Sequence, residues 1–273
     1  MGLRVNTNIA SLTAQRNLHN VTTRLNGNFQ RLSSGMRIAT AADDAAGLAI
    51  SERMRSLIRS YGVAARNAQD GISLTQTAEG ALNEVNSILN RMRELSMQSA
   101  NGTLSTADRG TLDVEFQELI EEVDRLAGET EFNGLPLLDG TLTDVTMQVG
   151  IDSGDTIVVP LEDTTSGTLG VDTLDVLDVT GAVGSLAILD TAIGTLNTAR
   201  GNLGASQNRM ASALRSIFNA RENLSAAESR IRDVDVAAES ADLTRNTIMQ
   251  QAAVSVLQQA NTQPQIALSL LQG

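Results

Sequence analysis

The sequence predicts a mainly α-helical protein of long antiparallel rods, packed as in a coiled coil, with a small β-hairpin insert. Three observations predict this fold class. Residues 186–231 follow a heptad pattern, residues 50–95 repeat apolar side chains every three or four positions, and aromatic residues make up only 2% of the chain. Such rods have no small globular core to cover their apolar seams, so each rod needs other rods beside it.

The heptad pattern predicts one unbroken helix over residues 186–231. No proline interrupts it, so a helix of roughly 69 Å is allowed at 1.5 Å per residue. Ten of the fourteen seam positions are apolar. The seam consists of Leu186, Leu189, Ile193, Leu196, Arg200, Leu203, Gln207, Met210, Leu214, Ile217, Arg221, Leu224, Glu228 and Ile231.

Shorter amphipathic patterns and capping residues place the other helices. Residues 18–36 form an apolar stripe that ends near Gly35, and residues 112–126 form another. Asp43 or Asp44 can cap the helix that contains residues 50–95, and Ser105 or Thr106 can cap the next one. Past residue 231 a weaker apolar pattern continues until Pro264, which is expected to interrupt it.

The middle of the chain predicts β-structure. Asn133-Gly134 and Asp139-Gly140 are turn pairs, and residues 145–149 and 157–159 read as two strands joined through the turn at residues 152–155. Residues 164–179 give only weak strand signals. The rods are therefore expected to flank a small β-rich insert.

Charge is distributed unevenly. All 20 basic residues are arginine, and residues 126–199 contain twelve acids and no base, so the net charge of −12 belongs to this middle segment. An acidic middle argues against nucleic acid binding and favours a solvated outer surface. Past Arg245 no side chain is charged, and we expect both chain ends to be disordered until neighbouring copies complete their packing.

Several kinds of chemistry are excluded by composition. The chain has no cysteine and a single histidine, His19, so disulfides, cysteine-based zinc sites and histidine clusters cannot form. No cofactor, metal or enzymatic activity is expected, because no motif arranges a nucleophile with a base and an orienting group. No cleaved signal is visible, and no run is expected to be apolar and long enough to span a membrane.

Five segments resemble bacterial flagellin. They are RLSSGMRIATAADDAAGLAI (residues 31–50), NAQDGISLTQTAEGALNE (67–84), RMRELSMQSANGT (91–103), ETEFNG (129–134) and AAVSVLQQANTQPQIALSLLQ (252–272). The similarity covers about residues 5–140 and 186–273, and the middle is far shorter than in large flagellins. The sequence is thus identified as a core flagellin with a reduced outer domain.

The resemblance implies a place in the filament for each segment of the chain. Residues 1–42 and 233–273 would form the inner tube of an extracellular flagellar filament, residues 43–128 and 181–232 the outer tube, and residues 129–180 an acidic insert on the filament surface. The resemblance also implies export in unfolded form through the flagellar type III apparatus. Polymerisation would use the helix seams of the two ends, namely Leu18, Val21, Leu25, Leu32, Ile248, Ala252, Val256 and Leu257.

The resemblance also implies partners. These are copies of the chain itself, the export apparatus, an export chaperone at the C-terminal segment, and the filament cap and hook-junction proteins. Residues 30–51 resemble the peptide that plant flagellin receptors sense, with Met36 and Ala42 as departures. The animal Toll-like flagellin receptor would read Arg91, Leu95, Gln98 and Glu115.

Two other functions are weighed against the filament subunit. A hook-filament junction protein of the same superfamily would share the terminal helices but be present in few copies, and the near-complete tail motif disfavours it. A secreted helical adhesin or translocator would use the acidic insert to bind a host surface. Seeded growth of long filaments would distinguish the filament subunit from the adhesin.

Overall fold

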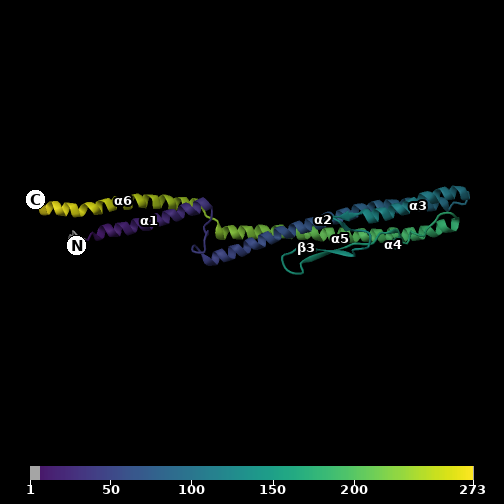
Figure 1. The fold of residues 1–273 in the computed structure, drawn as a ribbon, viewed down its shortest axis with the longest axis horizontal. Coiled ribbons are helices and arrows are strands. Elements are labelled where there is room, and N and C mark those ends of the chain that lie inside the picture. The colour runs from purple at the N-terminus through teal and green to yellow at the C-terminus, as the bar shows by residue number, and fades with distance from the viewer. Residues whose placement is uncertain (1–6, 273) are drawn as a thin grey trace. The chain divides into compact units, whose positions relative to one another are not determined.

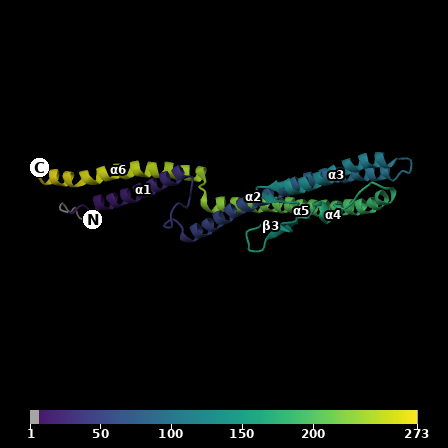
Figure 2. The same cartoon turned by 45° about the vertical axis from the view of Figure 1, so that its right-hand side comes forward.

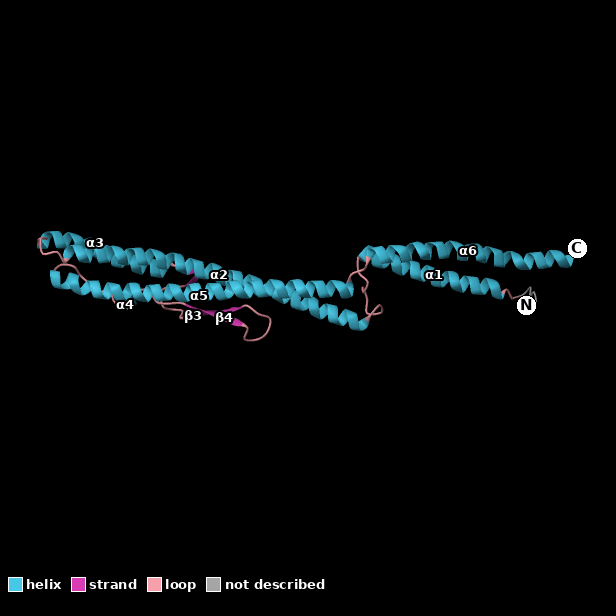
Figure 3. Ribbon diagram, turned by 180° about the vertical axis from the view of Figure 1, so that it is seen from behind, coloured by secondary structure: helices cyan, strands magenta, loops and turns pink. Residues whose placement is uncertain are grey.

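The structure is a computed structural model that describes residues 7–272, with side chains for residues 7–263. The chain divides into two compact units, residues 1–56 with 223–273 and residues 57–222. Two long helices, α2 (Ala45–Ser99) and α5 (Val179–Arg232), contribute to both units. Helices account for most of the described chain, as Figure 3 shows, which confirms the predicted fold class.

The first unit pairs the two ends of the chain. Helices α1 (Ile9–Ser34) and α6 (Val236–Gln272) lie side by side and run antiparallel (Figures 1 and 2). Gly35 ends α1 in the left-handed conformation, with φ of 71°, as the sequence predicted. The Arg37 backbone N–H then donates to the Arg232 carbonyl at 2.6 Å, which joins the residues after α1 to the end of α5.

Two expectations about the chain ends were wrong. Both ends are helical over the described residues, because α1 and α6 supply each other with a packing partner. Helix α6 also continues through Pro264 to Gln272. Residues 1–6 and Gly273, together with the side chains of residues 264–272, lie outside the described residues, so these parts of the prediction are not tested.

The second unit is a bundle of α2, α5 and α3 (Thr106–Glu129) around a large apolar core, with a smaller apolar cluster between α2 and α5. Asp44 caps α2 by accepting from the Gly47 N–H at 2.9 Å, and Ser105 forms a capping box with Asp108, so both predicted caps are confirmed. Helix α5 is unbroken, as the heptad pattern predicted. Its largest fully buried side chains are Leu189, Leu196 and Met210.

Two antiparallel strand pairs follow α3. Strands β1 (Glu131–Phe132) and β2 (Leu135–Pro136) are joined by Asn133 and Gly134, with φ of 53° and 77°, a turn conformation that Asn-Gly pairs favour. Strands β3 (Asp144–Gln148) and β4 (Thr156–Pro160) form the predicted hairpin, with Thr146 opposite Val158.

The segment after the hairpin differs from the prediction. Residues 164–179 contain the short helix α4 (Ser166–Leu169) and loops instead of strands. Four of its apolar side chains are buried in the bundle core, and the buried Thr164 and Ser166 also have backbone or carboxylate partners. The segment is therefore a packed layer of the second unit. Its buried apolar residues are Leu169, Val171, Leu174 and Val176.

Among the residues that the structure describes, one helix is long and apolar enough by composition to cross a membrane. Helix α5 contains an 18-residue window with a mean hydropathy of 1.5, of which 28% is buried, so the expectation that no run reaches this length was wrong. A single such helix is weak support for a membrane span, because core helices meet the same criterion. Leu189, Ala192 and Leu196 of α5 do lie in the bundle core.

Candidate assembly surface

The paired helices α1 and α6 leave most of their apolar side chains exposed. Among their described residues, the buried apolar ones are Ala14, Leu25 and Ala260. Apolar burial is the main favourable term in helix packing. With so few buried apolar residues, this pair gains little stabilisation from that term. The large apolar side chains that remain exposed are Ile9, Leu12, Phe29, Val236, Ile248, Val254 and Val256.

The predicted polymerisation residues divide into two sets. Leu25 is buried, and Leu18, Val21, Leu32 and Leu257 are half-buried. The other set is exposed, with Ile248 at 60%, Val256 at 58%, and Ala252 in the same class. The exposed set is free to contact a second molecule.

Polar contacts join α1 and α6 near the start of α6. Asn28 and Asn246 are buried, and the Asn246 Nδ2 donates to the Asn28 Oδ1 at 2.7 Å. Asn28 in turn donates to Glu239, which also forms an ion pair with Arg31 at 2.7 Å. The hydrogen bond from Arg31 lowers the pKa of the Glu239 carboxyl below its ordinary value. We call these four residues the proximal polar cluster.

A second polar cluster lies near the beginning of α1. Asn8 caps α1 through its Oδ1, which accepts from the Ser11 N–H at 3.0 Å, while its Nδ2 donates to the Ala260 carbonyl at 2.7 Å. The Ser11 hydroxyl donates to the Asn261 Oδ1 at 2.7 Å. We call Asn8, Ser11, Ala260 and Asn261 the distal polar cluster. Neither cluster was predicted, because sequence spacing does not say which residues of two distant helices meet.

The predicted receptor residues lie on α2 and α3 of the second unit. Arg91 donates from Nε to a carboxylate oxygen of Glu115 at 2.8 Å and from Nη1 to Glu94 at 3.0 Å. These hydrogen bonds, the one to Glu115 first, raise the pKa of the Arg91 guanidinium. Gln98 is exposed, but Leu95 is fully buried in the bundle core. The structure therefore brings Arg91 and Glu115 together and removes Leu95 from the surface of this chain.

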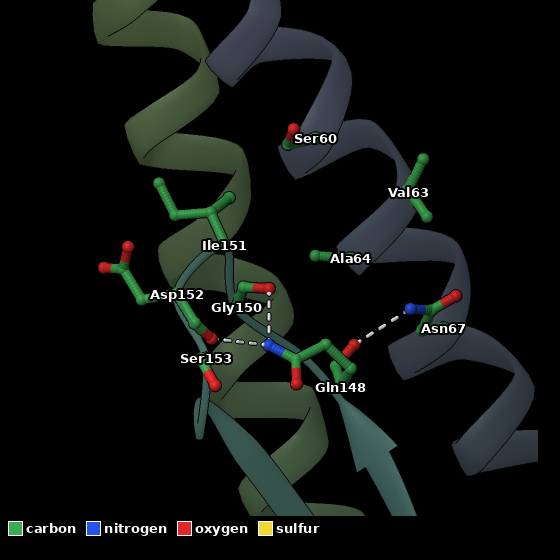
Figure 4. A pocket seen from close by; sticks show the side chains of 9 residues that line it. All are labelled: Ser60, Val63, Ala64, Asn67, Gln148, Gly150, Ile151, Asp152 and Ser153. Atoms are coloured by element: carbon green, nitrogen blue, oxygen red, sulfur yellow. Dashed lines mark hydrogen bonds between the residues drawn. The ribbon is translucent and has the colours of Figure 1, made fainter.

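A depression of about 420 Å³ lies between α2 and the loop after β3 (Figure 4). Its polar groups are largely paired within the fold. The Gln148 Nε2 donates to the carbonyls of Gly150 and Asp152 at 3.0 and 2.8 Å, and the Asn67 Nδ2 donates to the Gln148 carbonyl at 3.0 Å. These hydrogen bonds hold the loop after β3 in place against α2.

Residues 7–263 are the residues whose side chains the structure describes. Within that range no three His, Asp or Glu side chains come close enough to hold a metal ion. His19 is exposed on α1. The chemistry available at the end helices is association through apolar and polar contacts.

Long helices that pair the chain ends and keep apolar side chains exposed define a self-assembling structural protein. Comparison with known proteins identifies the family. The bacterial flagellin N-terminal helical region matches residues 5–143, and the bacterial flagellin C-terminal helical region matches residues 186–271. The chain belongs to the bacterial flagellins, the structural subunits of the extracellular flagellar filament.

Similar proteins cover nearly the whole chain. A flagellin of Halalkalibacterium halodurans is 46% identical over 269 residues, which span 98% of this chain and 99% of that protein. The flagellin of Bacillus subtilis is 42% identical, over 98% of this chain and 100% of that one. A flagellar filament 33 kDa core protein of Treponema phagedenis is 41% identical, over 98% and 99%. The junction-protein and adhesin alternatives are not favoured.

Solved structures share the fold. The crystal structure of Bacillus cereus flagellin is 38% identical, covers 56% of this chain and 88% of its own, and has a TM-score of 0.51. A putative flagellar hook-associated protein from Vibrio parahaemolyticus has a TM-score of 0.55 at 16% identity, covering 70% of this chain and 98% of its own. At that identity the second likeness concerns the fold alone.

Proposed function

We propose that this flagellin polymerises through the exposed apolar faces of α1 and α6, while the bundle of the second unit supplies a rigid body. The observation that carries the proposal is the exposure of Ile248 and Val256, at 60% and 58%, on a helix without charged side chains after Arg245. Neighbouring copies would cover these side chains. A head-to-tail contact whose rotation does not close then builds an open helical filament.

Removing either chain end tests the proposal. A chain lacking residues 1–35 or residues 233–273 keeps the whole second unit. We expect folded molecules that no longer grow from filament seeds, as measured by sedimentation and electron microscopy. Polymer formed at the yield of the complete chain would overturn the role given to the ends.

Point variants test whether the apolar side chains themselves, apart from the presence of the chain end, are needed for polymerisation. The change Ile248→Ser with Val256→Ser removes two exposed apolar side chains, so we expect seeded growth to fall while the circular dichroism of the free chain stays the same. Gln251→Ser and Gln258→Ser are the matched controls, because both residues are exposed and polar on the same helix. Equal growth of the two double variants would contradict the proposal.

The finer partners follow from membership of the family. The chain would leave the cell unfolded through the flagellar type III apparatus, with a chaperone on its C-terminal segment, and assemble beneath the filament cap onto the hook-junction proteins. A chain without cysteine suits this route, because no disulfide can form before export. A deletion of residues 233–273 that left chaperone binding unchanged would contradict this placement.

A host receptor for free flagellin would contact the ion pair between Arg91 and Glu115. It would also contact Gln98, which lies two helical turns after Arg91 on α2. Supporting this, Arg91 and Glu115 are both partly exposed, at 49% and 44% of their side chains. Arg91→Ala should lower receptor activation by the free chain. Arg93→Ala is the control, because Arg93 pairs instead with Asp190 of α5. Activation that is unchanged by Arg91→Ala would reject the assignment.

A further inference from the structure

The pairing of α1 with α6 has few large buried apolar side chains, which are the feature that usually sets the register of two helices. Among the described residues of the pair, the buried apolar ones are Ala14, Leu25 and Ala260, and two of these are alanine. Small side chains form shallow knobs and holes, so sliding one helix by a heptad would change apolar burial little. Register must therefore come from other contacts.

The two polar clusters agree on one register. Residues 8 and 11 meet residues 260 and 261, and residues 28 and 31 meet residues 239 and 246. In an antiparallel pair, an advance along α1 is matched by an equal retreat along α6. Both clusters satisfy that relation in a single alignment, although they lie at opposite ends of α1.

A slip by one heptad breaks the proximal polar cluster in either direction. In one direction Asn246 would replace Glu239 and Ala253 would replace Asn246, which leaves Arg31 without its carboxylate and removes the donor that the Asn28 Oδ1 has at the place of Asn246. In the other direction the place of Glu239 would lie beyond the start of α6 at Val236, so Arg31 would again have no carboxylate partner. Glu239 would then take the place of Asn246 beside Asn28. Of these three alignments, the observed one gives Asn28 both its amide and its carboxylate partner and gives Arg31 its carboxylate.

The distal polar cluster depends on the position of a proline in α6. Pro264 has no N–H, so the Ala260 carbonyl lacks the donor four residues later that an α-helix ordinarily provides. The Asn8 side chain supplies that donor at 2.7 Å. Because α6 contains one proline, its interior presents one carbonyl of this kind, and a slipped α1 would place Asn8 beside carbonyls that are already bonded.

We infer that these two clusters are a register key, which fixes the alignment of the chain ends and thereby sets how the exposed apolar side chains of α1 and α6 are placed relative to one another for a neighbouring copy. A pair slipped by one heptad would keep the same faces outward but would displace Ile248 and Val256 by about 10.5 Å along the pair relative to Phe29. The inference rests on the proposed function for its consequence in assembly. The alignment itself is a property of the single chain.

Disulfide trapping tests the register, since the chain contains no native cysteine. Ser11→Cys with Asn261→Cys reports the observed register, because these side chains are in contact. Ser11→Cys with Val254→Cys reports a slip of one heptad. Each pair is placed in the full chain and in a chain that also carries Asn28→Leu and Asn246→Leu. Apolar replacement of a buried polar pair preserves helix packing while removing its directional demand.

With Asn28 and Asn246 present, we expect the native disulfide and no slipped one. With both replaced by leucine, we expect the slipped disulfide to approach the yield of the native one, and the yield of pelleted polymer to fall, with helix content unchanged. Asn26→Leu with Gln251→Leu is the matched control, because both residues are exposed on the same two helices. The control should trap the native register alone.

Three results would overturn the register key. The first is a native disulfide alone in the Asn28→Leu, Asn246→Leu chain. The second is slippage in the control. The third is no native disulfide in the chain that keeps Asn28 and Asn246. A chain that traps the native register as expected but never forms polymer would contradict the proposed function and leave the register key standing. The two failures are thus distinguishable.

Discussion

Single residues in this flagellin divide sharply between core and surface even when they are neighbours on one helix. Leu95 is fully buried, whereas Met97, two positions later on α2, is 60% exposed. A helix turns by about 100° per residue, so two positions reverse the direction of a side chain. The receptor residues predicted from the flagellin motif must be judged against this division, since their motif alone does not report burial.

Truncating Leu95 should destabilise the bundle rather than alter a surface. Leu95→Ala removes buried methyl groups and leaves a cavity, so we expect the free energy of unfolding to fall by about 2–5 kcal/mol. Met97→Ala, its exposed counterpart, should change that free energy by less than about 0.5 kcal/mol. Urea unfolding followed by circular dichroism measures both, and equal effects would contradict the placement of Leu95 in the core.

Glu239 should make the pairing of the chain ends sensitive to acid. Its carboxyl has an ordinary pKa of 4.5, and the hydrogen bond from Arg31 lowers this pKa in the folded chain. A lowered pKa means that the stabilisation is fully present above pH 4.5 and is lost as the pH falls through the lower, folded value. Glu239→Gln should therefore lower the Tm of the end helices at pH 6, and this difference should vanish towards pH 3.

Glu118→Gln serves as the control for this pH dependence, because Glu118 is exposed on α3. We expect its Tm difference from the unaltered chain to be small throughout. A difference for Glu239→Gln that stayed constant from pH 6 to pH 3 would show that its carboxylate charge does not support the pairing.

At the scale of elements, helix boundaries follow from local chemistry, and the structure confirms those predicted from it. Asp44 and Ser105 bond to N–H groups within three residues of themselves, and Asn133-Gly134 adopts the turn that its own backbone preference favours. These interactions need no information from distant parts of the chain. Sequence is sufficient for them.

The misjudged elements depend on distant partners. Pro264 was expected to interrupt α6, but the carbonyl it leaves unpaired accepts from Asn8, which is 252 positions away from Ala260. Residues 164–179 gave only weak strand signals, and the structure shows that Leu169 and Val176 pack into the bundle core and that Asp124 of α3 accepts from the Ser166 N–H. The proximal and distal polar clusters were invisible in the sequence for the same reason.

The capping box at the start of α3 offers a test at this scale. Ser105→Ala removes the oxygen that accepts from the Asp108 N–H, and we expect a loss of about 1 kcal/mol in the free energy of unfolding. Thr106→Ala is the control, because Thr106 is exposed at the first helical position. If thermal unfolding assigned the same loss to both variants, the capping box would not be a stabilising contact.

At the scale of the whole molecule, the two units differ in how many apolar side chains they bury. The second unit buries Phe116, Leu138 and many other apolar side chains in a continuous core. The pair of α1 and α6 buries three apolar residues within its described side chains and depends on polar contacts for alignment. Helices with so few buried apolar contacts open readily, and neighbours that cover Ile248 and Val256 would stabilise them.

Hydrogen exchange of the free chain and of the assembled polymer tests this account most directly. We predict that backbone amides of α1 and α6 exchange quickly in the free chain and are strongly protected in the polymer. Amides of α2 and α5 between residues 57 and 222 should be protected in both. Equally strong protection of α1 and α6 in the free chain would contradict the claim that neighbouring copies complete their packing.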